Sequence, residues 1–361
     1  MLAAVTRSGA ESFVVESVDL DDIREDEILV KVVASGICQT DLWFKRSRAS
    51  DAPPAVLGHE AAGIVEQVGP SVVGVRPGDH VVLSFRHCGQ CSRCQMGNPA
   101  YCRRGPSLNL TGRRIDGSAV LHQNGEPLFG SFLGQSSFAQ YAVATVDNAI
   151  VIDNDVDFAV AAPLGCGLLT GASTTMNVLC PDTDARMVVY GAGAVGLAAL
   201  MAAAAAGVRT LIAVDPVPSR RALAERLGAS VTVDPTTANV VAAVTDLTKG
   251  GATHAVDTSG VAESIHNGLR SLATNGTFAA VGLGAPQVTV DMQMMVLKGL
   301  TFRGSSMGDC VPAKVIPALV RLYRAGRFPV QELVTAYAAT DINQAVADAA
   351  SGATIKPVLL W

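Results

Sequence analysis

The glycine-rich turn at residues 191–196 constrains the fold of this chain more than any other stretch. An apolar run at residues 187–190 precedes the turn, and an alanine-rich segment at residues 194–206 follows it. A short apolar run of this kind is typical of a parallel strand that is buried on both faces. The sequence therefore predicts a strand, a tight turn and a helix, the opening unit of a doubly wound parallel sheet.

The turn has the spacing Gly-x-Gly-x-x-Gly. Gly191 permits the tight bend, Gly193 lets the backbone approach a pyrophosphate, and Gly196 lets the helix pack closely on the strand. The helix then begins at Ala194 and Val195, where free backbone N–H groups and the positive end of the helix dipole would bind phosphate. These features predict a dinucleotide site.

A second apolar strand, predicted at residues 210–214, supports this interpretation because it ends on Asp215. That carboxylate stands 19 residues after Gly196, which suits a ligand of the adenosine ribose. Its charge would repel a 2′-phosphate, so we predict NAD, although Arg220 and Arg221 keep NADP open as an alternative. The alternative is an ordinary tight βα turn that binds no dinucleotide.

Length and composition exclude several classes of protein. A chain of 361 residues suggests two domains, and 49% hydrophobic with 16% charged residues is typical of a compact globular protein. A net charge of −5 without a long basic run argues against a nucleic-acid partner. We find neither an apolar run with membrane character nor a signal-peptide pattern, so we expect a cytoplasmic protein with no membrane partner.

Four cysteines form the most specific metal signal, with the spacing C-x2-C-x2-C-x7-C at Cys88, Cys91, Cys94 and Cys102. Four thiolates close a tetrahedral shell and leave no position for substrate, which is the geometry of structural zinc. An iron–sulfur cluster also takes four thiolates and ranks second. Four free surface thiols would oxidise readily, so that alternative is weaker.

Two further cysteines and one histidine suggest a second metal site. A catalytic zinc takes three protein ligands and keeps one position open, and two cysteines with one histidine form such a set. Cys38, His59 and Cys166 fit it, but they lie far apart in the sequence. Spacing alone supports this site only weakly, because a lone histidine or cysteine is more often structural.

The rest of the chain divides around the glycine turn. Alternating residues at 13–18 and 27–33 predict antiparallel strands of an irregular β domain, and residues 105–137 have the composition of a long surface loop or lobe. We expect a strand at residues 137–143, helices at residues 168–179 and 312–325, and a last strand at residues 356–360. We assign residues 1–167 and 310–361 to a catalytic domain with a zinc lobe at 86–104, and residues 168–309 to the dinucleotide domain.

Over essentially its whole length the chain resembles the zinc-dependent medium-chain alcohol dehydrogenases. The resemblance rests on the motifs at residues 36–41, 58–60 and 164–167, on the four-cysteine lobe and on the glycine turn. Residues 97–102, 135–139 and 327–329 are most similar to bacterial aryl-alcohol (benzyl alcohol) dehydrogenases. The resemblance implies a GroES-like catalytic domain joined to a Rossmann domain, in a homodimer or homotetramer.

The resemblance also implies roles for individual residues. It implies two zinc ions per chain, a catalytic ion on Cys38, His59 and Cys166 and a structural ion on Cys88, Cys91, Cys94 and Cys102. Thr40 would accept the substrate proton, Asp41 would orient His59, and Glu60 would assist ligand exchange. Cofactor contacts would come from Gln39, Asp215, Arg220 and Lys356, the last of these on the pyrophosphate. Trp43, Ser84 and Phe85 would line the substrate pocket.

Two positions depart from the pattern of the family. Gln39 stands where many members carry a histidine or arginine, so we expect weaker cofactor binding or faster release. Trp43 stands where a histidine often ends the proton relay, and an indole has no acceptor nitrogen. Protons would then leave through the ribose and water.

The predicted reaction is the reversible transfer of a hydride from a primary, aromatic or allylic alcohol to NAD, which gives the aldehyde. Alternatives of the same fold are a glutathione-dependent formaldehyde dehydrogenase and an aliphatic or terpenoid alcohol dehydrogenase. A zinc-free quinone reductase is disfavoured by the candidate ligands. A zinc module that binds nucleic acid is disfavoured by the acidic balance of the chain.

Overall fold

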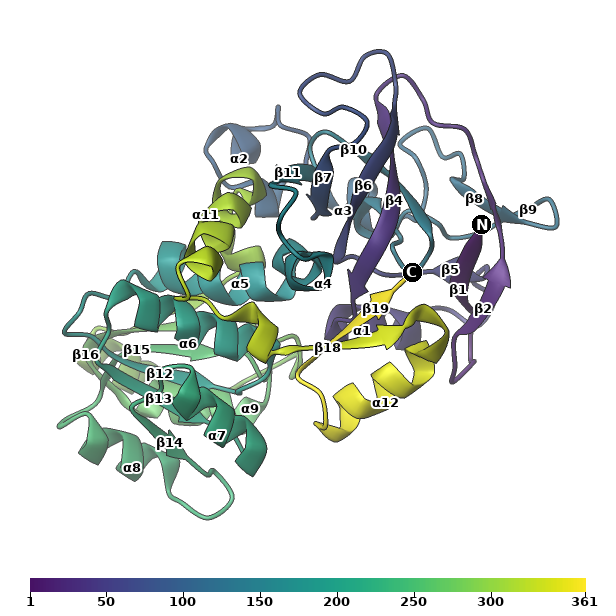
Figure 1. Cartoon of the computed structure of the whole chain (residues 1–361). Helices are drawn as coiled ribbons and strands as arrows, with labels where there is room; N and C mark the ends of the chain where they lie inside the picture. Colours follow the sequence, from purple (N-terminus) through teal and green to yellow (C-terminus); the bar gives the residue numbers. More distant parts are fainter. The chain divides into compact units, whose positions relative to one another are not determined.

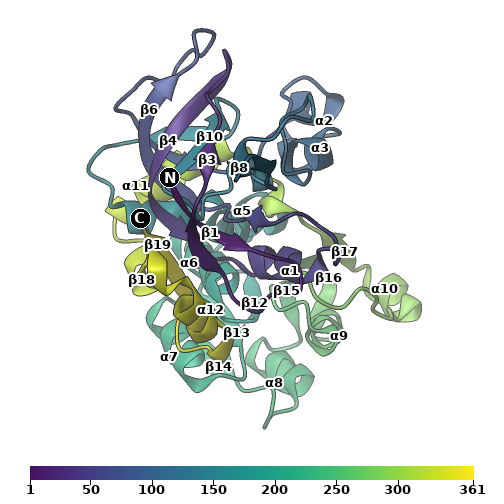
Figure 2. The same ribbon diagram turned by 90° about the vertical axis from the view of Figure 1, so that its right-hand side faces the viewer.

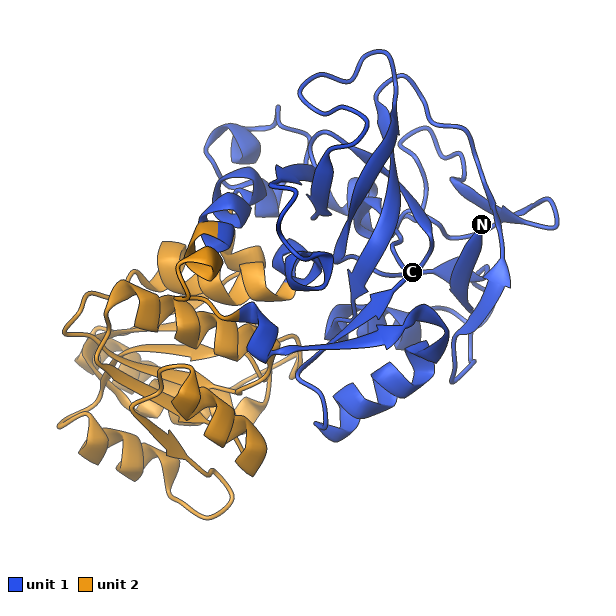
Figure 3. Ribbon diagram, viewed as in Figure 1, with its two compact units in different colours: residues 1–166, 311–320, 330–361 blue, residues 167–310, 321–329 orange.

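The computed structural model describes all 361 residues, which form two compact units (Figure 3). The first unit contains residues 1–166, 311–320 and 330–361, and the second contains residues 167–310 and 321–329. The division differs from the predicted one at Gly167, Cys310 and residues 321–329, all of which the sequence assigns to the catalytic domain. In this segment the Arg327 guanidinium donates a hydrogen bond to the Ala205 carbonyl of the second unit.

The largest sheet of the first unit has seven strands (Figure 1). Six follow the order β11-β7-β6-β4-β19-β18, and β10 pairs with β4. All of these pairs are antiparallel except β18 with β19. The strands are β4 (Glu27–Gly36), β6 (Ala61–Val68), β7 (His80–Leu83), β10 (Tyr141–Thr145), β11 (Ala149–Ile152), β18 (Val334–Ala338) and β19 (Lys356–Leu360).

Two three-stranded sheets and several short helices complete this unit. One sheet has the order β2 (Val14–Ser17), β1 (Leu2–Thr6) and β5 (Ala55–Val56). The other has the order β3 (Asp19–Leu20), β8 (Leu121–Gln123) and β9 (Glu126–Pro127). The α-helices are α1 (Gln39–Ser47), α2 (Ser92–Gln95), α3 (Gly105–Asn109), α4 (Phe158–Ala161) and α12 (Ile342–Ser351), which packs on β18 and β19 (Figure 2). The 3₁₀ turns are η1 (Pro99–Tyr101), η2 (Phe132–Gly134), η3 (Ala162–Gly165), η6 (Val330–Glu332) and η7 (Ala339–Asp341).

Strand β4 runs through the middle of this sheet. Its residues Ile28, Val30 and Val32 are buried and pack with side chains from β6 and β7. The strand ends at Gly36, opposite Val358 of β19, and α1 begins three residues later. This arrangement places the segment around residue 38 beside the start of β19.

Of the two alternatives that composition left open for residues 105–137, a long surface loop or a lobe, the structure shows a folded lobe. It contains α3, β8, β9 and η2, and it buries Leu121, Leu128 and Phe132 in a core cluster of the first unit. Buried Arg114 anchors the segment through a bidentate ion pair, in which Nε lies 2.7 Å and Nη2 lies 3.0 Å from the two carboxylate oxygens of Glu27. The following strand, β10, begins at residue 141 and not at residue 137 as predicted.

The second unit is a doubly wound α/β domain, as predicted. Its six-stranded, fully parallel sheet has the order β14-β13-β12-β15-β16-β17. The strands are β12 (Arg186–Tyr190), β13 (Thr210–Val214), β14 (Val231–Val233), β15 (Ala252–Asp257), β16 (Leu272–Ala280) and β17 (Thr301–Gly304). The helices are α5 (Gly167–Ser173), which continues into the π-helical η4 (Thr174–Leu179), then α6 (Ala194–Ala206), α7 (Pro218–Arg226), α8 (Val240–Leu247), α9 (Ala262–Arg270), α10 (Met292–Lys298) and η5 (Met307–Asp309).

Helix α11 (Pro312–Arg324) belongs to both units, since the division falls between residues 320 and 321. No single helix has the length and apolar composition that crossing a membrane requires. One bent pair, Phe158–Gly165 with Gly167–Leu179, meets that requirement only when its two helices are taken together.

Candidate metal and cofactor sites

The fold brings the three proposed ligands of the first metal site together within the first unit. Ligand atoms of Cys38, His59, Glu60 and Cys166 all lie within 4.8 Å of one another. Cys38 precedes α1, His59 and Glu60 precede β6, and Cys166 follows η3. The Nε2 atom of His59 is buried and has no hydrogen-bond partner. A buried nitrogen without a partner beside two thiols fits a metal ligand, so these residues suit a zinc ion.

Asp41 holds the histidine in the orientation that metal binding requires. Its Oδ1 lies 2.7 Å from Nδ1 of His59 and accepts a hydrogen bond from the Gly58 N–H at 3.1 Å. Its Oδ2 accepts from the Cys38 N–H at 3.0 Å. The carboxylate is fully buried, and it ties together the two segments that carry Cys38 and His59. Because Nδ1 faces this carboxylate, Nε2 is the ring nitrogen that is left to bind a metal ion.

Neighbouring groups and burial shift the pKa values of Cys38 and His59 in this cluster. The hydrogen bond from Cys166 and the neighbouring His59 hold the pKa of Cys38 well below the ordinary thiol value, although burial works in the other direction. Burial disfavours a charged imidazole at His59, but Asp41 and Cys38 raise its pKa well above the ordinary value. A thiolate at Cys38 is the form that binds a metal ion.

Lys356, which the sequence predicts to contact the cofactor pyrophosphate, lies next to Glu60 of this cluster. The residue is 2% exposed, and Nζ lies 2.6 Å from Oε2 of Glu60. Nζ also donates to the Ile37 carbonyl at 3.1 Å. The pairing of β19 with β4 places this lysine at the end of β4. The Glu60 carboxylate therefore has a cationic partner inside the protein.

The remaining residues predicted near the first site occupy different environments. Oγ1 of Thr40 lies 3.7 Å from Sγ of Cys38, close to the metal ligands. Gln39 is exposed at the start of α1, and Trp43 on the same helix is 53% exposed. Phe85 is buried. Ser84 is also buried, and its hydroxyl donates to the Gly165 carbonyl at 2.7 Å, next to the candidate ligand Cys166.

The four cysteines of the predicted lobe also converge, with ligand atoms within 4.8 Å of one another. Cys91 Sγ lies 3.6 Å from Cys94 Sγ and 4.0 Å from Cys102 Sγ. Backbone N–H groups point at the sulfurs, since Cys88 N–H donates to Cys102 Sγ and Cys91 N–H donates to Cys88 Sγ. Backbone N–H groups of Cys94 and a neighbouring arginine lower the pKa of Cys91 to about 6. These residues fit an ion held by four thiolates.

In the second unit, the glycine turn has the shape of a phosphate site. Gly191 has φ +91°, in the region that favours glycine. A Cβ at Gly196 would lie 1.8 Å from the Gly191 carbonyl oxygen, whereas a Cβ at Gly193 would meet no atom within 4 Å. The space beside Gly193 is therefore open, and Ala194 and Val195 at the start of α6 are partly exposed. These residues fit a bound pyrophosphate.

Asp215 lies at the carboxyl end of β13, next to this turn. Its Oδ2 accepts from the Ala192 N–H at 2.7 Å, and its Oδ1 accepts from the Val217 N–H at 2.8 Å. Each carboxylate oxygen keeps a lone pair for a ribose hydroxyl. Nη1 of Arg220 lies 4.0 Å from Oδ2 of Asp215, and Arg221 donates to the Asp215 carbonyl at 2.7 Å.

Two supporting residues were missed by sequence reasoning. Thr258 donates to the backbone carbonyls of Tyr190 and Gly191 and so braces the glycine turn. Gln135 is buried, and its side chain contacts the backbone at His59. Neither residue belongs to a ligand motif, and only the pairing of distant segments shows what they contact.

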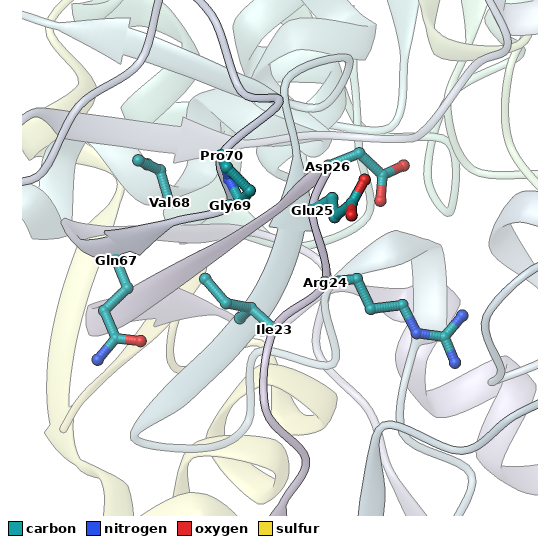
Figure 4. Close-up of a pocket in the computed structure, with 8 residues that line it drawn as sticks. All are labelled: Ile23, Arg24, Glu25, Asp26, Gln67, Val68, Gly69 and Pro70. Carbon is teal, nitrogen blue, oxygen red and sulfur yellow. The ribbon is translucent and has the colours of Figure 1, made fainter.

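One surface hollow of the first unit lies apart from both metal clusters. It is lined by Ile23–Asp26 on one side and Gln67–Pro70 on the other (Figure 4). Arg24 at its edge is already bound to Asp116 and Ser118. None of the predicted site residues lines this hollow.

Known proteins match both parts of the chain. Residues 24–154 match the family described as alcohol dehydrogenase GroES-like domain, and residues 194–324 match the family described as zinc-binding dehydrogenase. Geraniol dehydrogenase of Castellaniella defragrans is 40% identical over 363 residues, which cover 99% of this chain and 97% of that protein.

Two solved structures are similar over nearly their whole length. The crystal structure of benzyl alcohol dehydrogenase from Acinetobacter calcoaceticus has a TM-score of 0.94 at 40% identity, and covers 99% of this chain and 98% of its own. An alcohol dehydrogenase zinc-binding domain protein from Burkholderia ambifaria has a TM-score of 0.97 at 43% identity, with the same coverage of 99% and 98%.

Proposed function

Since this chain belongs to the zinc-dependent medium-chain alcohol dehydrogenase family, we propose that it oxidises a primary aromatic or allylic alcohol to the aldehyde with NAD. The observation that carries this proposal is the cluster of Cys38, His59 and Cys166 around a buried His59 Nε2 that has no hydrogen-bond partner. We propose these three residues as the ligands of the catalytic zinc, and the four-cysteine lobe as the site of a second, structural zinc.

In the proposed reaction the residues of the chain position the substrate and remove a proton. When bound, zinc supplies a Lewis acid for the alcohol oxygen, and NAD supplies the hydride acceptor. Thr40, beside Cys38, accepts the hydroxyl proton of the substrate. Asp41 keeps His59 oriented, and the Lys356 ammonium neutralises Glu60, so that the carboxylate does not add a further uncompensated charge to the site. Trp43 cannot continue a proton relay, because an indole has no acceptor nitrogen; with NAD bound, a ribose hydroxyl and water would carry the proton away from Thr40.

The substrate class is the finer part of this proposal. Relatives named for benzyl alcohol and for geraniol are both about equally similar to this chain, at 40% identity, which supports an aromatic or an allylic alcohol. The test is the appearance of NADH absorbance with zinc-replete protein and benzyl alcohol, geraniol or a short aliphatic alcohol. A preference for the aliphatic alcohol, or for formaldehyde with glutathione, would overturn the aromatic or allylic assignment and keep the reaction class.

Variants test the assignment of the ligands. We expect Cys38→Ala and His59→Ala to abolish turnover and to retain the fold by circular dichroism. The matched control is Cys180→Ala, because Cys180 is exposed and belongs to neither metal cluster. Near-normal activity of either ligand variant would contradict the assignment.

The preference for NAD is proposed from the position of Asp215. A carboxylate that accepts the ribose hydroxyls repels a 2′-phosphate. We expect NADP to be a poor cofactor and Asp215→Ala to gain activity with NADP relative to NAD. An unchanged ratio of the two activities in this variant would contradict the explanation.

We also propose that the chain forms a homodimer or a homotetramer. Strand β17 is the edge of the parallel sheet, and the neighbouring α10 leaves Met292, Val296 and Leu297 exposed. A second copy would cover this apolar face. The resemblance of residues 288–290 and 300–304 to the edge region through which dimers of the family pair supports this proposal. Light scattering measures the mass of the assembly, and Val296→Asp is expected to lower it. A monomeric parent protein would overturn the proposal.

A further inference from the structure

We propose that Gln135 is a positioning residue of the catalytic metal site, which holds the segments that carry His59 and Cys166 at a fixed separation. The residue is 2% exposed, and its side chain hydrogen-bonds to backbone groups and not to the proposed metal ligand atoms. The inference rests on the proposed catalytic zinc and adds to it a residue that acts through the backbone.

The amide of Gln135 joins two backbone segments. Its Nε2 donates to the His59 carbonyl at 2.9 Å and to the Ser84 carbonyl at 3.2 Å. Its Oε1 accepts from the Ala61 N–H at 3.2 Å. Both amide hydrogens and the amide oxygen are therefore used, and the contacts at His59 and Ala61 bracket the ligand segment on either side of Glu60.

The connection continues from Ser84 to the third ligand. The Ser84 hydroxyl donates to the Gly165 carbonyl at 2.7 Å, and Cys166 is the next residue. A Cβ at Gly165 would lie 2.2 Å from the Leu83 carbonyl oxygen, so this segment packs directly on the end of β7. A change in the position of Ser84 relative to His59 would therefore also change the position of Cys166.

The turn that presents Gln135 has an unfavourable backbone conformation. Leu133, Gly134 and Ser136 have φ values of 48°, 70° and 52°. Left-handed conformations cost free energy for residues other than glycine, and they persist where the surrounding structure maintains them. Here the Ser136 hydroxyl donates to the Val56 carbonyl at 2.7 Å. The turn directs the glutamine side chain inward, toward the two ligand segments.

A purely structural role and a positioning role predict different results for the metal site. Loss of a structural hydrogen bond lowers the stability of the unit and leaves the geometry at the metal unchanged. Loss of a positioning contact changes the ligand field of a metal bound by Cys38, His59 and Cys166. Cobalt in place of zinc reports that field in its visible spectrum, and its transfer to a chelator reports how firmly each site holds the ion.

The experiment compares Gln135→Met with Gln140→Met in cobalt-loaded full-length protein. Methionine keeps the length of the side chain and removes its hydrogen bonds. Gln140 is a matched control, because its Oε1 accepts from the Leu2 N–H at 2.9 Å at a partly exposed position away from the ligands. We expect Gln135→Met to shift the cobalt bands of the three-ligand site and to release that cobalt about 10-fold faster. The four-cysteine site and the control should behave like the parent protein.

Each other outcome overturns the inference. A parent-like spectrum and release rate in Gln135→Met, or equal acceleration at both metal sites, assigns Gln135 to general stability. If Gln135→Met does not fold, Gln135→Glu retains the volume and the acceptor for Ala61 and loses the donors, and a parent-like spectrum in that variant is equally decisive. A parent protein that binds no cobalt at the three-ligand site would instead overturn the proposed zinc site, and this inference with it.

Discussion

Replacing Gly193 with alanine should separate cofactor binding from folding. Gly193 has φ −81° and ψ −174°, a conformation that alanine adopts without strain. No atom lies within 4 Å of the position of the added Cβ. The methyl group therefore has room in the cofactor-free protein, but it fills the space in which we propose that the pyrophosphate approaches the backbone.

Two small effects on the free energy of unfolding oppose each other in this variant. Alanine reduces the entropy of the unfolded chain, which stabilises the fold by about 0.4–1 kcal/mol. Alanine is also a poorer residue than glycine before the first turn of a helix, by roughly 0.5 kcal/mol. We expect a net change within about 1 kcal/mol, or no more than about 4 °C in Tm for a unit of this size.

The effect on cofactor binding should be much larger. A methyl group that displaces one hydrogen bond between the N-terminus of α6 and a phosphate costs about 1.5–3 kcal/mol. The Kd for NADH should then rise about 10- to 100-fold. Titration calorimetry measures the Kd, and thermal unfolding of the same samples measures the stability.

Gly196→Ala is the control in which folding and binding should fail together. Its Cβ would lie 1.8 Å from the Gly191 carbonyl oxygen and 2.9 Å from Oγ1 of Thr258, so the turn must move. Overpacking of this kind costs about 1–3 kcal/mol or more. A Gly193→Ala protein that binds NADH as tightly as the parent would refute the placement of the pyrophosphate beside Gly193.

Three further predictions concern the side chains around the metals and the free thiols. Asp41→Asn should lower turnover about 10- to 100-fold because it weakens the orientation of His59, and steady-state kinetics that match the parent would count against this role. Cys102→Ser should remove one zinc per chain by metal analysis and lower the Tm, and an unchanged zinc content would contradict the four-thiolate site. Burial raises the pKa of Cys310 to about 12, so a thiol reagent at mildly alkaline pH should modify exposed Cys180 and leave Cys310 intact in the folded, metal-replete protein, as mass spectrometry can show.

Local patterns in the sequence predicted the elements around the glycine turn of the second unit closely. Helix α6 spans the predicted residues 194–206, and β13 spans the predicted residues 210–214. Hydrophobic runs, a helix start and the Gly-x-Gly-x-x-Gly spacing act over a few residues, so the information for these elements is contiguous in the chain. The same is true of the four-cysteine lobe, whose ligands lie within one short stretch.

Composition was a poor guide where long-range contacts decide the structure. Residues 105–137 are rich in loop-forming residues, yet they pack Leu121, Leu128 and Phe132 into a core, because buried Arg114 and the neighbouring strands hold them there. The assignment of residues 321–329 to the second unit likewise depends on packing at the end of α11. A polar composition indicates that a segment can be exposed to solvent. It does not indicate whether other segments of the chain pack over it.

The three-ligand site shows the limit of the sequence most clearly. The sequence by itself was enough to predict the glycine turn and the cysteine lobe. It also carried the resemblance to the family, which implied Cys38, His59 and Cys166 as ligands. Only the tertiary structure decided that these three residues meet, that Lys356 pairs with Glu60 and that Gln135 joins their segments. The physical reason is that side chains far apart in the chain are brought within hydrogen-bonding distance by strand pairing and core packing, which depend on the whole unit and on no single motif.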